Sequence, residues 1–204
     1  MRPTTYVNTP GGIFTAEGVW FYTTEEALRA YAGSILERIP LERVLAEAAV
    51  WYRSGWALGL VLLPLLLLAL PWWVAALTTL GLYVLWELIK PAWYAHTLAG
   101  LFYHLEQLWL QFLLYLIVLS VLLMTDQWAS ALTGLGGFVL FRYGIIDWIA
   151  RQTLGTLKLS WYHLPEADAI LRGCLIRYAI RFGLPLPGLE EMRQRILEFL
   201  QRRA

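Results

Sequence analysis

The sequence has little charge, one cysteine and few histidines. Of its 204 residues 15% are charged, whereas soluble domains carry about 25%. The single cysteine, Cys174, can form no disulfide within the chain and no cysteine-based metal cluster. Three histidines and a formal net charge of +1 favour neither a haem or metal site nor binding to nucleic acid. We therefore expect no cofactor, no metal site and no nucleic-acid partner.

The common catalytic motifs are also missing. The sequence contains no Walker motif, no GxGxxG after a strand, no GxSxG elbow and no HExxH pair. The N-terminal segment has no early apolar run, so we expect an internal membrane span rather than a cleaved signal peptide. These absences favour a protein that is not an enzyme.

Long apolar runs are what the sequence has in abundance. Hydrophobic residues make up 59% of the chain, and no charged residue occurs from Ser54 to Trp86. From Gln107 to Phe141 the only charge is Asp126. Each run exceeds the ~20 residues that cross a bilayer. As one helix the first run would be about 50 Å long against a ~30 Å hydrocarbon core, so we expect each run to cross twice.

Two short turns divide these runs, one at Pro71–Trp73 and one at Thr125–Trp128. Neither contains Lys or Arg, and tryptophan prefers the membrane interface, so both turns are expected outside the cell. The sequence thus predicts a mainly α membrane protein, a four-helix bundle of two antiparallel hairpins in the cell (inner) membrane. Both termini are expected in the cytoplasm. The predicted spans are 54–70, 73–90, 106–124 and 128–148, within a bundle domain at 54–148.

The segments 1–53 and 149–204 are expected to build one small cytoplasmic α+β part. Residues 4–23 alternate β-branched and aromatic residues around two turns, which predicts a β-hairpin or short meander. Residues 156–163 have period-2 patterning and are expected to join that sheet. Helices are predicted to begin with the capping signature at 23–26, at Pro40 and at Pro165, with Gly183 ending the last of these, and a final amphipathic helix follows Gly188.

Ionisable residues within the predicted spans are the first candidates for function. Glu87 and Arg142 lie at similar depth, and we expect them to form a buried ion pair. An inner-interface charge layer is expected to contain Arg53, Lys90, Glu106 and Asp147. We favour structural charge pairing over a transport pathway, because unpaired charges are the better mark of a pathway.

A polar stripe follows the cytoplasmic half of the third span. Its members, spaced along one helix face, are His104, Gln107, Gln111 and Tyr115. We favour hydrogen bonding between helices, and a water-filled path for protons or ions is the alternative. Small residues that would let helices approach closely occur in the first and fourth spans. These are Gly55, Gly59, Gly134, Gly136 and Gly137.

Three functional hypotheses follow from the sequence. The favoured one is a non-enzymatic polytopic membrane protein that acts by assembly, as a homo-oligomer or as a small subunit of a larger membrane complex. Its partners would be the lipid bilayer, its own copies or other membrane subunits. The alternative is an ion or proton channel or transporter whose path includes the polar stripe, Glu87 and Arg142. The weakest is a membrane-embedded enzyme with an inner-surface pocket of His96, His104 and Glu106.

Overall fold

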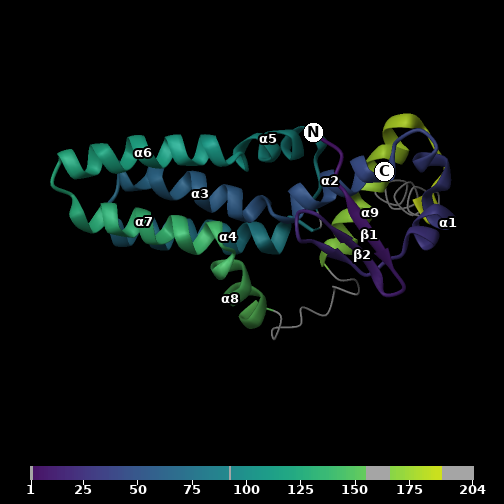
Figure 1. Ribbon diagram of the computed structural model, residues 1–204, viewed down its shortest axis with the longest axis horizontal. Coiled ribbons are helices and arrows are strands. Elements are labelled where there is room, and N and C mark those ends of the chain that lie inside the picture. Colours follow the sequence, from purple (N-terminus) through teal and green to yellow (C-terminus); the bar gives the residue numbers. More distant parts are fainter. Residues whose placement is uncertain (1, 92, 155–165, 190–204) are drawn as a thin grey trace, which may run out of the picture. The chain divides into compact units, whose positions relative to one another are not determined.

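The computed structural model describes residues 2–91, 93–154 and 166–189 (Figure 1). The chain is mainly helical with one small three-stranded sheet. It divides into two compact units. The first unit comprises Met1–Ala49, Ala92–His96 and Leu164–Ala204, and the second comprises Val50–Pro91 and Thr97–His163. The first unit thus combines segments that precede and follow the bundle helices in the chain.

The sheet of the first unit is an antiparallel meander. Its strands are β1 (Tyr6–Thr9), β2 (Gly12–Thr15) and β3 (Trp20–Phe21), in the order β1-β2-β3. The meander expected within 4–23 is therefore confirmed. The first turn needs glycine at position 12, where φ is +143° and a Cβ would lie 2.1 Å from the Phe21 carbonyl oxygen. Ile13 and Phe21 point from one face into the core.

Helices cover the buried face of this sheet. Helix α1 (Glu25–Leu36) begins at Thr24, whose hydroxyl accepts a hydrogen bond from the Ala27 amide at 3.3 Å, as a capping residue does. Helix α2 (Leu41–Tyr52) starts directly after Pro40, and α9 (Glu166–Phe182) ends at Gly183 with φ +62°. These three helix starts and the α9 stop confirm the sequence predictions. Helix α9 contacts α1 and β3.

Two predicted elements of the cytoplasmic part lie outside the described residues. They are the strand at 156–163 and most of the final helix after Gly188.

The second unit is built on four packed helices. They are α3 (Ser54–Leu67), α4 (Trp72–Ile89), α6 (Leu108–Met124) and α7 (Trp128–Arg142). Short turns join α3 to α4 and α6 to α7, and each of these pairs forms an antiparallel hairpin (Figure 1). Helix α3 contacts α4, α6 and α7. We call the end of the bundle opposite the two turns its base.

Three further helix segments adjoin the base. Helix α2 is bent by 43° from α3, and α5 (His96–Leu105) is bent by 63° from α6. Helix α8 (Ile145–Leu154) follows α7 after Gly144, whose φ of +68° ends the helix. Among the described residues only α4 is long and apolar enough to cross a membrane as one helix, or up to three spans exist if each bent pair counts as one.

The helices found at the four predicted spans differ from the prediction at their ends, and the four-span bundle itself stays a prediction. The fourth, expected over 128–148, is broken at Gly144. The third begins at Leu108 rather than at Glu106, and the first ends at Leu67, because Leu68–Leu70 belong to the turn before Pro71. Backbone breaks shorten three of the four helices, α3, α6 and α7, whereas α4 keeps its predicted length.

Candidate functional site: two buried polar clusters

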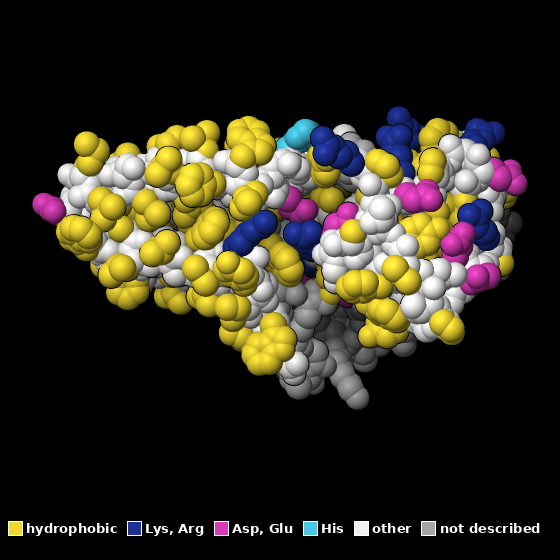
Figure 2. Space-filling view, in the orientation of Figure 1, with side chains coloured by type: hydrophobic (Ala, Val, Ile, Leu, Met, Phe, Trp, Pro, Cys, Tyr) yellow, Lys and Arg dark blue, Asp and Glu magenta, His cyan; other side chains and the backbone are white. Residues whose placement is uncertain are grey.

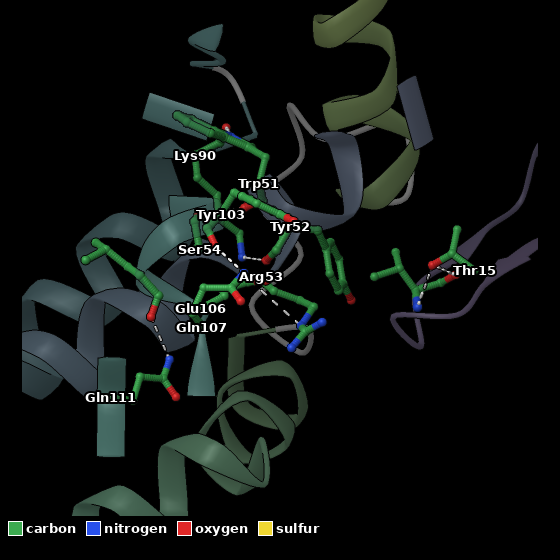
Figure 3. A network of polar contacts seen from close by, with 12 residues as sticks. Thr15, Trp51, Tyr52, Arg53, Ser54, Lys90, Tyr103, Glu106, Gln107 and Gln111 are labelled. Carbon is green, nitrogen blue, oxygen red and sulfur yellow. Dashed lines mark hydrogen bonds and ion pairs between the residues drawn. The ribbon is translucent and has the colours of Figure 1, made fainter. Parts of the chain in front are cut away.

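The base of the bundle contains a buried polar cluster, drawn in Figure 3. Lys90 at the end of α4 is fully buried, and its ammonium group lies 2.6 Å from the Glu87 carboxylate one turn earlier. The same ammonium donates to the Tyr52 carbonyl at 2.6 Å. Tyr52 ends α2, and the last carbonyls of a helix have no partner within it. Lys90 therefore neutralises a buried acid and caps α2 at its negative end.

Two tryptophans complete the cluster through a chain of hydrogen bonds. The Trp51 indole donates to the Lys90 carbonyl at 2.8 Å, and the Ser54 hydroxyl donates to the Trp51 carbonyl at 2.6 Å. The Trp86 indole donates in turn to the Ser54 hydroxyl at 2.7 Å. The rings of Trp51, Trp86 and Phe102 lie with centroids 5.4–5.7 Å apart. The carbonyls of Trp51, Tyr52 and Lys90, at the ends of α2 and α4, thus accept hydrogen bonds from side chains.

The expected charge layer is assembled only in part. Arg53, at the break between α2 and α3, lies 4.0 Å from Glu106 at the break between α5 and α6, and stacks its guanidinium over Trp56. Arg142 ends α7 and is half-buried. Asp147 falls in α8, and its side chain is outside the described set. Depth predicted a Glu87–Arg142 pair, but the structure pairs Glu87 with Lys90, which is one turn away on the same helix.

The polar stripe of the third span divides into two parts. His104 is exposed and Gln107 caps the Tyr103 carbonyl at 3.1 Å. Gln111 and Tyr115 instead point into the bundle and are 1% and 4% exposed. The Gln111 amide donates to the Leu105 carbonyl at 2.8 Å, which caps the end of α5 at the sharp bend into α6.

Four of the five predicted packing glycines face neighbouring helices. A Cβ at Gly55 would lie 2.1 Å from Glu87, one at Gly59 would lie 2.3 Å from Phe141, and one at Gly137 would lie 2.0 Å from Leu63. Gly134 is less tight, with its nearest contacts at 3.3 Å. No described atom lies within 4 Å of a Cβ at Gly136. The glycines of α3 and α7 thus allow close helix contact within one chain.

A second buried cluster lies in the first unit and centres on Glu47 of α2. One carboxylate oxygen contacts His96 Nδ1, and the other accepts a hydrogen bond from the Tyr178 hydroxyl of α9. The Tyr94 hydroxyl lies 3.1 Å from the same imidazole nitrogen, and the Cys174 thiol lies 3.8 Å from the carboxylate. The cluster joins α2, the 93–96 segment and α9.

Charge and burial oppose each other at Glu47. Burial would raise the pKa of this carboxyl, but the hydrogen bonds from His96 and Tyr178 outweigh burial and hold the pKa below its ordinary value. Burial, with the nearby Glu47 charge, raises the pKa of the Cys174 thiol. A thiol in this state is a poor nucleophile. The cluster is therefore arranged to hold a carboxylate in place, and Cys174 serves as a packed apolar group.

Sequence reasoning missed this second cluster. Glu47, His96 and Tyr178 are distant in sequence, and none lies in a recognisable motif. The available signal was an acid at position 47 between alanines on the apolar side of a predicted helix, where a charge needs a partner.

No group of three His, Cys, Asp or Glu side chains that could hold a metal ion occurs in the described residues. His96 belongs to the first unit, whereas His104 and Glu106 belong to the second. The pocket that the weakest hypothesis required is therefore not supported by a ligand set.

The chain matches no protein-family model, and neither a curated protein nor a solved structure resembles it closely enough to count as a relative.

Proposed function

We propose that the protein is a non-enzymatic integral membrane protein whose four bundle helices cross the bilayer and whose first unit lies in the cytoplasm and acts by assembly. The observation that supports the membrane assignment is the apolar surface of the bundle. Its outward positions carry large apolar side chains, and its interior combines an apolar core with several buried polar and small residues. Soluble bundles instead present charged and polar residues on the outward face.

The outward positions of the bundle carry large apolar side chains. On α6 these include Phe112, Leu116 and Ile117, which are 61%, 52% and 55% exposed. Figure 2 shows hydrophobic side chains over most of the visible face of the bundle, with charged ones near its ends. A soluble monomer rarely exposes a continuous apolar surface larger than a few hundred Å². Lipid tails would cover this apolar surface without exposing it to water.

The interior of the bundle holds several polar side chains within an apolar core. Ser54, Thr79, Gln111 and Ser130 are all buried there. The Thr79 hydroxyl donates to the Ala75 carbonyl of its own helix at 2.8 Å. Small and hydrogen-bonding residues at helix contacts are typical of membrane bundles, in which apolar burial does not itself drive association.

The helix lengths indicate a thin apolar zone. The bundle helices have 14 to 18 residues, or roughly 21–27 Å at ~1.5 Å per residue. Exposed tryptophans mark the turn end at Trp72, Trp73 and Trp128, and Trp109 lies near the base. Tryptophan at both ends is expected of interfacial belts. With no Lys or Arg in either turn, the positive-inside rule supports turns outside and a cytoplasmic first unit.

An apolar sheet face in the first unit supports action by assembly. Val7 pairs with Phe14 and Phe14 with Trp20 across the strands, so the three share one face. They are 62%, 43% and 37% exposed. We call them, with the neighbouring Tyr22, the sheet patch. A partner that covers this patch would remove aromatic area from water, and a second copy or another subunit of a membrane complex is the proposed partner.

Native mass spectrometry of the full chain, released from lipid nanodiscs, tests this function. We expect the wild type as an oligomer or bound to co-purified subunits, and Phe14→Ser with Trp20→Ser to reduce that species. The matched control is Ile180→Ser, which changes an exposed apolar residue of α9 outside the patch. A monomer in lipid and in detergent, unchanged by the patch substitutions, would contradict assembly.

The channel hypothesis has weaker support. Beyond Tyr115, the core of the bundle toward the turns is made of apolar side chains, including Val118, Leu122, Leu63 and Leu67. These residues close any polar path within a single bundle. Ion flux in liposomes that is lost on Gln111→Leu would favour this alternative over the proposed function.

A further inference from the structure

Two buried polar atoms face the bundle interior one helical turn apart. The Gln111 carbonyl oxygen and the Tyr115 hydroxyl have no hydrogen-bond partner among the described residues. Both side chains are more than nine-tenths buried. Leaving a buried polar group without a partner costs about 1–3 kcal/mol. Two such groups on successive turns of one helix therefore point to a shared ligand.

The orientation of Gln111 is fixed by its other half. Its amide nitrogen donates to the Leu105 carbonyl at the end of α5. A flip of the side chain would place two oxygens against each other, so the amide cannot turn its nitrogen inward. The carbonyl oxygen is therefore held as an acceptor facing the interior.

The position of Tyr115 favours a meeting with this oxygen. In a helix, long side chains lean back toward the N-terminus, so the residue at i+4 leans toward the residue at i. The Tyr115 ring is held edge-on against Phe138, with centroids 4.8 Å apart. Its hydroxyl can both donate and accept.

The ligand must donate to the glutamine oxygen and form a hydrogen bond with the tyrosine hydroxyl, as acceptor or donor. An anion cannot donate, and two neutral oxygens are too few to replace the hydration shell of a metal cation. A water molecule does both, and buried waters usually bridge otherwise unsatisfied polar groups. We propose that the bundle binds one internal water between the Tyr115 hydroxyl and the Gln111 carbonyl oxygen. This inference is independent of the proposed assembly function.

Difference infrared spectroscopy of the full chain in nanodiscs tests the water directly. Spectra of wild type minus variant are recorded in ordinary water and in water enriched in oxygen-18. We expect a water O–H band that shifts with the isotope and is lost in both Tyr115→Phe and Gln111→Leu. Ser120→Ala is the control, because this hydroxyl on the same helix donates to its own backbone at Leu116.

Stability gives a second readout. If water bridges the Tyr115 hydroxyl, Tyr115→Phe should raise the unfolding equilibrium constant about fivefold, the equivalent of one ordinary hydrogen bond. If the hydroxyl has no water partner, the same substitution should leave the unfolding free energy unchanged or raise it. An isotope-insensitive spectrum would overturn the proposal, as would density that places the tyrosine oxygen directly on the glutamine oxygen.

Discussion

The contact between Gly59 and Phe141 offers the sharpest test of how the bundle is packed. A Cβ at Gly59 of α3 would lie 2.3–2.6 Å from three atoms of the Phe141 ring on α7. The ring is 4% exposed and is held in a T-shaped contact with Tyr83 at 5.6 Å. It cannot rotate away, so Gly59→Ala must push the two helices apart.

The size of the effect follows from two opposing terms. Overpacking of a tight core costs about 1–3 kcal/mol, whereas replacing glycine by alanine inside a helix gains roughly 0.5–1 kcal/mol. The net loss for Gly59→Ala therefore lies between about 0 and 2.5 kcal/mol and is about 1 kcal/mol at the middle of the two ranges. Gly136→Ala on α7 meets no described atom within 4 Å, so only the gain remains, and this variant is the matched control.

The assay is reversible unfolding of the full chain in lipid–detergent mixtures, followed by tryptophan fluorescence. We expect Gly59→Ala to be less stable than the wild type and Gly136→Ala to be equal or more stable. Phe141→Leu, combined with Gly59→Ala, should recover part of the loss, because the branched side chain can move aside. Equal stability of the two alanine variants would refute the packing of α3 against α7.

Three further predictions concern the buried charges and the membrane. Lys90→Met leaves the buried Glu87 without its ammonium partner and should cost about 3–5 kcal/mol in the unfolding assay; adding Glu87→Leu should restore most of it, and an unchanged wild-type stability would contradict a buried pair. The pKa of Glu47 is held below its ordinary 4.5, so this carboxylate stabilises the fold above that pH and the contribution is lost as the pH falls through the folded-state value. Glu47→Gln should therefore lose less unfolding free energy than the wild type when the pH is lowered from neutral. An acid transition identical to that of the wild type would show that Glu47 does not contribute to this pH dependence. The short helices should make the bundle most stable in bilayers of short-chain lipids, because mismatch costs a fraction of a kcal/mol per Å; a preference for thick bilayers in the same assay would argue against membrane spans of this length.

The four bundle helices were predictable because long uncharged runs, divided by Pro71 and by Asp126, have few other solutions. Their ends were not. The break at Gly144 depends on a left-handed backbone conformation, which glycine permits but does not require. The break at Arg53 depends on donors for the freed carbonyls, and these donors are the Lys90 ammonium at the end of α4 and the Ser54 hydroxyl.

Partners of buried charges were predicted less well than their positions. Glu87 and Arg142 were matched by their depth, and such a comparison considers only partners on other helices. Lys90 was closer, at i+3 on the same helix. Glu47, His96 and Tyr178 meet only through tertiary packing, so no local pattern in the sequence could have joined them.

In the proposed membrane placement, the presence of Glu87 and Lys90 on one helix has a consequence for insertion into the bilayer. A pair between Glu87 and Arg142 could form only after α6 and α7 had been synthesised, and until then the acid would face lipid alone. Because Lys90 follows Glu87 by one turn, the charge is neutralised as soon as α4 is helical. If the bundle spans a bilayer as proposed, the α3–α4 hairpin enters it with this charge already neutralised, before the second hairpin is synthesised.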